Sequence, residues 1–599
     1  AAQTVSELVA GLLVGNPVAP IVGDAVGAAV AGLLASPGVV ASVGSVIGGL
    51  IPDLFSQPGL VSAVAGAVGG AVSALVAGQD TATVIADLVA ALQGSAAVQT
   101  GLGAFAADAL NGLLGDVTLW DALGDQVSVL ITTLGTNTDV QDYAAETVSD
   151  LVAGFLVGNP VAAIVGDAVG AAVAGLLAAP GVAASLGSLI GGLLPDLFAQ
   201  PGLVPVISNA LGGAVSALVA GQDTAAVIAA LIDSLRAATP IQDGLQAFAT
   251  DALNGLLGDV TLWDALGDQV SVLITTLGTN TDVQDYAAET VSDLVAGFLV
   301  GNPVAAIVGD AVGAAVAGLL AAPGVAASLG SLIGGLLPDL FAQPGLVPVI
   351  SNALGGAVSA LVAGQQDTAA IIGNVIATLQ ASAAVQTGLG AFTTDALTGL
   401  LGDATLWAAL GEQVSQLLIT LGTNAEVQDY AAETVSELVA GLLVGNPVAS
   451  IVGDAVGAAV AGLLASPGVV ASVAPVIGAV VPDLFDQPGL VSALTDAVGP
   501  ALSALFSGYD SATVIDALIA TLRASSAIQD GVGAVATDAL SVLLGDATLW
   551  NALGDQVAVV ITTLGTNTEV QQYAAQTAAD IVSGILVGTP VASIVGDAV

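Results

Sequence analysis

The stretch VAAIVGDAVGAAVAGLLAAPG, residues Val161–Gly181, decides the fold class of this chain. Large apolar side chains recur in it at the i, i+3, i+4 spacing of one helix face: Val161, Ile164, Val165, Val169, Val173, Leu176 and Leu177. The opposite face is small, with Asp167 as its only charge: Ala162, Ala163, Gly166, Gly170, Ala171, Ala174 and Gly175. Glycine weakens an isolated helix by about 1 kcal/mol per site relative to alanine. We therefore expect these glycines to let a second neighbouring helix approach closely. The helix would then be packed on two sides, as an inner layer of the protein and not as a surface helix.

This helix and its surroundings return along the whole chain. AAQTVSEL begins at Ala1, and related segments begin at Ala144, Ala287, Ala431 and Ala574, which is a step of 143 residues, or 144 in one case. The additional residue lies in GQQDT, at Gln365–Gln366. The chain therefore divides into repeat 1 (1–143), repeat 2 (144–286), repeat 3 (287–430), repeat 4 (431–573) and the start of a fifth (574–599).

Proline, glycine and capping residues interrupt each repeat at seven places. In repeat 2 these are NPV at Asn159, APG at Ala179, QPG at Gln200, GQDT at Gly221, TPI at Thr239, GDVTLW at Gly258 and GTNTDV at Gly278. The pattern predicts an all-α protein, an α-solenoid with about seven short helices of about 16–18 residues in each repeat. Because seven helices is an odd number, consecutive repeats start in opposite directions if every connection reverses the chain. Otherwise one connection does not reverse the chain, or one of the interruptions lies within a kinked helix.

The composition excludes several classes of function. The 599 residues are 55% hydrophobic, with 49 acidic residues against two basic ones, Arg236 and Arg523, and a net charge of −47. Such a chain repels nucleic acid. The sequence contains no Cys, His or Lys, so thiolate metal sites and the usual proton shuttles and Schiff bases have no residues to form them. We predict no catalytic, cofactor-binding or metal site, and no enzyme.

Two repeated motifs contain residue types that could form a binding site. GDAVG at Gly166–Gly170 has neither the Lys nor the preceding strand of a phosphate loop, which favours helix packing. The acids of GDVTLWDALGDQ (Asp116, Asp121 and Asp125) lack the ligand spacing of a Ca²⁺ loop, so we expect caps, solubility and diffuse cation binding.

One tryptophan and one tyrosine recur in every repeat. They are Trp120, Trp263, Trp407 and Trp550 in TLW, and Tyr143, Tyr286, Tyr430 and Tyr573 in QxY. We expect them to anchor contacts between helices; exposed aromatics that line a carbohydrate or self-association surface are the alternative.

A membrane protein is the main competing class, because the mean hydropathy is +0.96. Expected helices shorter than about 20 apolar residues, the absence of basic loops and a mid-helix Asp argue against spanning. Binding of lipid in an apolar groove remains open.

The segment LLASPGVVASVGSVIGGLIPDLFSQPGLV, residues 33–61, and its copies resemble the Ala/Gly/Val-rich secreted or cell-surface repeat proteins of actinobacteria such as mycobacteria. The resemblance covers the whole chain, is compositional, and implies a surface or secreted location without catalytic residues. A haloarchaeal surface protein would share the acidity and the lack of lysine.

These observations lead to one expected function and one alternative. We expect a non-enzymatic structural protein that forms an extracellular filament or cell-surface fibre by stacking of helical repeats, with itself as partner, head to tail, because neither end carries a polar capping repeat. The chain begins in repeat phase without an initiator Met, so we expect a processed product or a piece of a longer protein. The alternative is an envelope-associated lipid-binding solenoid with an apolar groove.

Overall fold

The computed structural model describes residues 2–363, 368–466, 468–506 and 509–585. This part of the chain is all-helical and contains no strand, which confirms the predicted class. The helices are α1(Ala2–Leu12), α2(Ala19–Ala35), α3(Pro37–Ser56), α4(Leu60–Val76), α5(Thr81–Gln93), α6(Ala96–Leu114), α7(Val117–Gly135), α8(Thr138–Phe155), α9(Ala162–Ala178), α10(Val182–Ala199), α11(Leu203–Val219), α12(Thr224–Ala237), α13(Thr239–Leu257), α14(Val260–Thr279), α15(Thr281–Phe298), α16(Ala305–Ala321), α17(Val325–Phe341), α18(Leu346–Ala363), α19(Thr368–Ala381), α20(Ala383–Leu401), α21(Ala404–Thr423), α22(Ala425–Leu442), α23(Ala449–Leu464), α24(Val469–Phe485), α25(Leu490–Phe506), α26(Ser511–Ala524), α27(Ser526–Gly545), α28(Ala547–Thr566) and α29(Thr568–Ile585).

The helices of repeat 2 end and begin at the seven predicted interruptions. Polar caps start several of them: Asp223 accepts a hydrogen bond from the Ala226 amide at 3.0 Å, and Asn280 accepts one from the Val283 amide at 3.1 Å. At Gly181 the backbone has a φ of 91°, which glycine adopts without strain. The helices are less uniform than predicted, since α12 has 14 residues and α14 has 20. The interruptions are therefore located correctly, but they are unevenly spaced.

In repeat 2, which the structure describes without a gap, two of the seven connections reverse the chain. The first reversal joins α8 to α9 and the second joins α11 to α12, and both pairs then pack side by side. Other connections only bend the path, by 63° between α12 and α13 and by 70° between α16 and α17. Three helices therefore run one way and four run back, which accounts for the odd number without any alternation between repeats.

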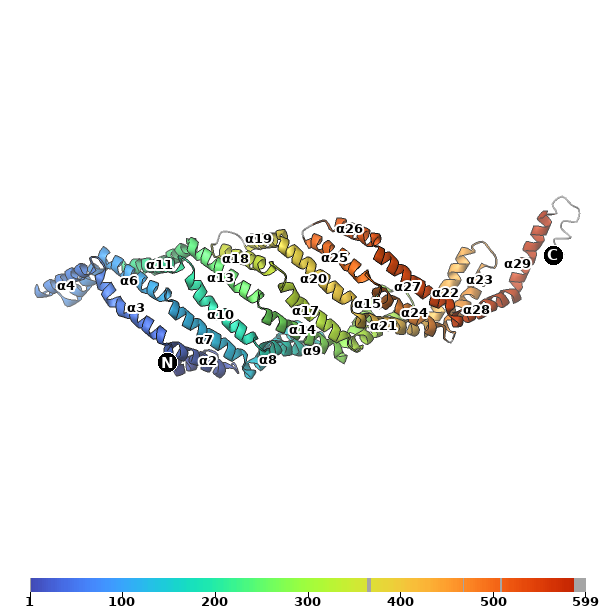
Figure 1. Ribbon diagram of the computed structural model, residues 1–599, viewed down its shortest axis with the longest axis horizontal. Helices are drawn as coiled ribbons and strands as arrows, with labels where there is room; N and C mark the ends of the chain where they lie inside the picture. The colour runs from blue at the N-terminus through green and yellow to red at the C-terminus, as the bar shows by residue number, and fades with distance from the viewer. Residues whose placement is uncertain (1, 364–367, 467, 507–508, 586–599) are drawn as a thin grey trace.

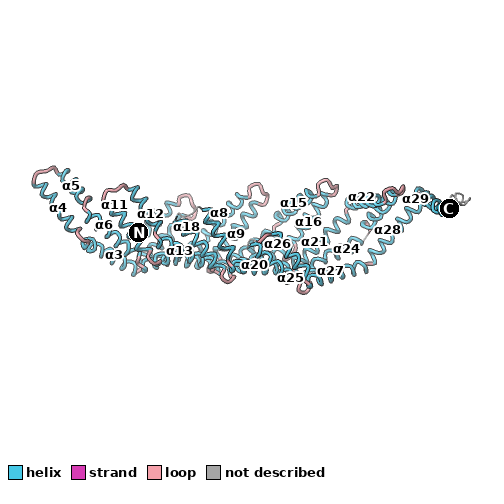
Figure 2. The backbone as a smooth tube through the Cα atoms, turned by 90° about the horizontal axis from the view of Figure 1, so that it is seen from above, coloured by secondary structure: helices cyan, strands magenta, loops and turns pink. Residues whose placement is uncertain are grey.

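We call these two groups of helices the A arm and the B arm. The A arms are α2–α4, α9–α11, α16–α18 and α23–α25; the B arms are α5–α8, α12–α15, α19–α22 and α26–α29. In Figure 1 the middle helices of successive arms, from α3 to α27, lie as parallel diagonals along an elongated molecule. Figure 2 shows that the reversals at α4/α5, α11/α12 and α15/α16 project to the same side.

The elongated arrangement leaves much of the chain in contact with solvent. Its accessible surface is 30,397 Å². A compact monomer of 57.1 kDa would expose about 19,000 Å² by the usual scaling. Many large apolar side chains contribute to the difference, including Phe155, Phe298 and Leu442, each at least 78% exposed at a hairpin end.

Helix α9, which holds most of the Val161–Gly181 stretch, lies between α8 and α14. Gly166 and Gly170 of its small face are buried, whereas Ala163 and Ala171 are exposed, and Val165 and Val169 of the apolar face are half-buried. Asp167 is exposed. The helix is thus packed on two sides, as its two faces predict, while a third side faces solvent.

Candidate functional site

The tightest recurring feature of the structure is the contact between a B arm and the A arm that follows it. We call this contact the seam. The first seam places α6, α7 and α8 against α11, α10 and α9; the second places α13, α14 and α15 against α18, α17 and α16; the third places α20, α21 and α22 against α25, α24 and α23. Each seam joins the three helices of an A arm to the last three helices of the B arm before it, in antiparallel order.

Glycines bring the backbones of the seam into contact. A Cβ atom on Gly124 of α7 would collide with the carbonyl oxygen of Gly191 of α10, and a Cβ on Gly191 would collide with the carbonyl oxygen of Gly124. One turn away, a Cβ on Gly187 would lie 2.7 Å from the carbonyl oxygen of Ser128. Real Cβ atoms do not approach carbonyl oxygens so closely, so the helices can pack this way only without side chains. The pairs Gly267/Gly334 and Gly411/Gly478 repeat the arrangement in the second and third seams.

An aromatic pair lies on each seam beyond the glycines. Trp120 of α7 stacks on Phe198 of α10, with ring centroids 3.9 Å apart and an interplanar angle of 15°. The indole Nε1 of Trp120 also donates a hydrogen bond to the carbonyl oxygen of Leu114 at 2.8 Å. The pairs Trp263/Phe341 and Trp407/Phe485 stack at 4.0 Å and 4.2 Å. These three tryptophans are therefore anchors between helices, as predicted.

The tyrosines make a second recurring contact, within each repeat. The hydroxyl oxygen of Tyr286 on α15 accepts a hydrogen bond from Nδ2 of Asn159, 3.1 Å away, just before α9. The Oδ1 atom of the same Asn159 accepts a hydrogen bond from the Val161 amide at 3.0 Å. Tyr143 with Asn16 and Tyr430 with Asn302 form the same bond at 3.0 Å. The QxY motif thus joins the B arm of one repeat to the NPV turn that precedes its A arm.

The GDAVG motif is a packing motif. A Cβ on Gly166 would lie 2.6 Å from the carbonyl oxygen of Ser149 on α8, and Gly170 faces the carbonyl oxygen of Ala145. The carboxylate of Asp167 accepts a hydrogen bond from the Ser149 hydroxyl at 2.8 Å. The glycines therefore face a neighbouring helix instead of a ligand.

The acids of the GDVTLWDALGDQ motif separate into two roles. Asp116 accepts a hydrogen bond from the Leu119 amide at 3.3 Å, which caps α7, and another from the Ser42 hydroxyl. Asp121 and Asp125 line an open hollow of about 360 Å³ on the seam together with Asp196. Within the described ranges, no group of three or more acids lies close enough to hold a metal ion.

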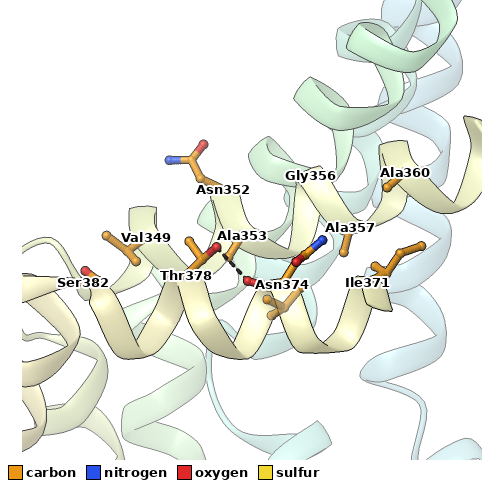
Figure 3. Close-up of a pocket in the computed structure, with 11 residues that line it drawn as sticks. Val349, Asn352, Ala353, Gly356, Ala357, Ala360, Ile371, Asn374, Thr378 and Ser382 are labelled. Atoms are coloured by element: carbon orange, nitrogen blue, oxygen red, sulfur yellow. Dashed lines mark hydrogen bonds between the residues drawn. The ribbon is translucent and has the colours of Figure 1, made fainter. Parts of the chain in front are cut away.

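A shallow groove follows the second reversal of the chain. Between α18 and α19 it encloses about 540 Å³, and Figure 3 shows Gly356, Ala353 and Ala357 on one side of it with Ile371 and Asn374 on the other. Thr378, also in this groove, donates a hydrogen bond to the carbonyl oxygen of Asn374 at 2.8 Å. Smaller grooves of 270 Å³ and 170 Å³ lie at the corresponding places between α4 and α5 and between α11 and α12.

The expectation that the helices are too short to span a membrane is wrong for four helices in the described part of the chain. Gly38–Ser56, Val182–Ala199, Leu346–Ala363 and Ser526–Gly545 are long and apolar enough to cross a bilayer, and up to nine spans would result if each bent pair were one. Helix length therefore gives no reason to exclude a membrane.

Comparisons of the chain with protein-family models, with curated proteins and with solved structures found no match.

Sequence reasoning anticipated the tryptophans of the seam and missed the phenylalanines on which they stack. Phe198, Phe341 and Phe485 each end a PDLF segment, and this segment recurs with the same period as TLW. Two aromatic positions that recur at a constant separation could have been read as a pair.

Proposed function

We propose that the chain is an α-solenoid of tandem repeats and serves as a non-enzymatic structural protein, a filament or cell-surface fibre built by stacking of helical arms. The observation that carries the proposal is the recurrence of one seam three times, with the same glycine contact and the same Trp–Phe stack. Each repeat then contacts chiefly its neighbours, so that additional repeats extend the rod without new contacts.

An extracellular or cell-surface location fits the composition. Two arginines and no lysine leave trypsin-like proteases two cleavage sites, and both arginines lie in last turns of helices, Arg236 in α12 and Arg523 in α26. A net charge of −47 keeps rods with exposed apolar side chains apart in water and repels nucleic acid. The resemblance to secreted actinobacterial repeat proteins points the same way.

Electron microscopy of native material, without detergent, tests the proposal. We expect long, thin fibres with an axial repeat. Discrete particles, or material that disperses only in detergent, would contradict a filament and favour a lipid-associated protein.

The groove favours a second candidate, an envelope-associated protein that binds lipid. The α18/α19 groove is lined mainly by Gly, Ala, Val and Ile, and related grooves lie in two other repeats. Its residues present no charged side chain for a headgroup, so the ligand would be the acyl chain of a lipid. Native mass spectrometry separates the candidates: stoichiometric long-chain lipid supports binding, and lipid-free chains in fibres support a structural role.

A further inference from the structure

The hairpin ends at the first reversal of the chain expose large apolar side chains. Where α8 joins α9, Phe155 and Val157 are 80% and 84% exposed, and where α15 joins α16, Phe298 and Val300 are 82% and 84% exposed. The same two positions between α22 and α23 hold Leu442 and Val444. We call each of these three pairs a tip. Every tip lies between neighbouring arms that the structure describes, so its exposure does not depend on where the chain begins or ends.

The tips carry no charge, although the chain as a whole is strongly acidic. Residues 151–166, between Asp150 and Asp167, contain no charged side chain, and neither do the corresponding residues 294–309 and 438–453. The turns of the second reversal differ, because Asp80 and Asp223 lie in them as caps of the next helix. Exposed apolar side chains and an absence of charge therefore coincide at one kind of hairpin end.

The turn at the α8/α9 tip pairs several of its own backbone groups. The amides of Asn159 and Ala162 donate hydrogen bonds of 2.9 Å and 3.1 Å to carbonyl oxygens of the turn, and the Val161 amide donates one of 3.0 Å to Oδ1 of Asn159. The same bonds recur at Asn302 and Asn446. Paired backbone groups lower the free-energy cost of moving a turn from water into an apolar medium. The tips thus have the side chains, the neutrality and the backbone pairing of a segment that enters lipid.

A lipid surface fits these tips better than a protein does. Two large side chains at each tip cover much less than the about 800 Å² that each partner buries in a specific protein interface. Contact between the tips of two copies would also bring chains of net charge −47 alongside each other. The ends of α8/α9 and α15/α16 project to the same side of the rod (Figure 2), and a fluid bilayer accepts separate projections without a matching shape.

We propose that the tips insert into the interfacial region of a bilayer whose lipids carry no net charge, so that the rod is attached to the membrane at several points. This rests on the proposed cell-surface role and names the surface to which the rod attaches. Each tip binds weakly, and attachment through several tips of one chain raises the overall affinity. Anionic lipid is a poor partner because it repels the acidic chain.

Flotation with phosphatidylcholine vesicles, in the presence of a chelator, tests the proposal. We expect the wild type to float with the vesicles and the double variant Phe155→Ser/Phe298→Ser to bind about tenfold more weakly or less, because two apolar anchors are lost. Both side chains are exposed, so the fold is retained, which circular dichroism checks. The matched control is Val129→Ser/Val272→Ser, which removes two side chains, each 55% exposed, from α7 and α14 away from the tips and should bind like the wild type.

A third variant separates the tips from the groove between α18 and α19. Gly356 lines this groove and has open space around its Cβ position, so Gly356→Leu fills the groove without disturbing the fold. If the tips hold the membrane, this variant floats like the wild type. Vesicles of anionic phosphatidylglycerol should bind the wild type much less than phosphatidylcholine vesicles do.

Other results would overturn the proposal. A wild type that does not float, a Phe155→Ser/Phe298→Ser variant that floats like the wild type, or a control variant that loses as much binding would each exclude attachment through the tips. Loss of flotation in Gly356→Leu alone would place the lipid in the groove. Dilute wild-type chains that associate without vesicles, in sedimentation velocity, while the Phe155→Ser/Phe298→Ser variant stays monomeric would assign the tips to a second copy.

The outcome is independent of the filament. Fibres in native material from a protein that does not bind vesicles would refute the membrane contact and leave the filament in place. Vesicle binding that depends on the tips, without fibres in native material, would support the contact and refute the filament.

Discussion

Gly124 on α7 and Gly191 on α10 lie back to back, each occupying the space that a Cβ atom on the other would need. This relationship accounts for the glycines of the seam, which are some of the 77 in the chain. Each glycine costs helix propensity, and at the seam that cost is offset because the two backbones approach closely enough for continuous van der Waals contact along the helices.

Adjacent glycines on α17 provide a direct test of the seam. Gly334 is buried against Gly267, and Gly335 is exposed with open space around it. We expect Gly334→Ala to lower the free energy of unfolding by about 1–3 kcal/mol, because the added methyl group overpacks the contact. Gly335→Ala should instead raise it, by up to about 1 kcal/mol, through helix propensity. Urea unfolding followed by circular dichroism measures both; equal effects would show that the seam is not closely packed.

The stacked pair Trp407/Phe485 should stabilise the fold by more than the burial of its surface alone. In a double-mutant cycle with Trp407→Ala and Phe485→Ala, we expect a coupling of about 0.5–1.5 kcal/mol in the free energy of unfolding. Trp550→Ala is the control, because this ring keeps the hydrogen bond from its Nε1 to the Leu544 carbonyl oxygen but is 46% exposed. In dilute protein, Trp550→Ala should lower the free energy of unfolding by less than Trp407→Ala does. Strictly additive single substitutions would mean that the stacking contributes nothing specific.

One helix cap gives the protein a predictable response to acid. The Thr513 amide and hydroxyl donate hydrogen bonds of 3.0 Å and 2.9 Å to the Asp510 carboxylate, which caps α26, and they hold the pKa of Asp510 below its ordinary value. A lowered folded-state pKa stabilises the fold above the unfolded value of about 3.9, and this contribution is lost as pH falls through the folded pKa. In Thr513→Ala, which keeps the amide bond, the pKa of Asp510 should rise part of the way.

Carbon-detected NMR titration of the Asp510 carboxyl measures this effect. Asp510→Asn keeps a capping side chain without a titrating group, so its stability should lack the corresponding acid-dependent component. A pKa of Asp510 that does not change on Thr513→Ala would contradict the assigned role of the hydroxyl.

The sequence determined where helices begin and end better than it determined how they connect. Pro, Gly and capping residues act locally, so interruptions such as Ala179 and Thr239 were located without knowledge of the tertiary structure. Whether a connection bends or reverses depends on which helix the next one packs against. TPI at Thr239 gives a bend of 63°, and GQDT at Gly221 gives a hairpin; nothing in local propensity separates the two.

The seam was predictable only in part, for a similar reason. The small face of α9 was read correctly as a contact surface, because a helix with two unlike faces must pack on both. The partner of Trp120 was not, because Phe198 is distant in sequence and lies beyond several interruptions. The exposure of single residues could not be predicted from the letters, since Val61 and Val204 are the same residue type in the same motif but are 52% and 7% exposed.

Divalent cations should drive lateral association of the rods. Each chain carries a net charge of −47, with exposed apolar side chains such as Phe155 and Phe298 at the hairpin ends. At physiological ionic strength the Debye length is about 8 Å, so salt screens neighbouring rods only partly. A divalent cation binds between carboxylates of two rods and removes more of the repulsion than an equal ionic strength of Na⁺. We therefore expect millimolar Ca²⁺ to raise light scattering strongly and a chelator to reverse the increase.

A sodium control separates bridging by Ca²⁺ from general screening. NaCl at matched ionic strength should leave the scattering nearly unchanged, because a monovalent ion screens charge without joining carboxylates of two rods. If Ca²⁺ left the scattering at the level of the NaCl control, charge repulsion would not be what keeps the rods apart.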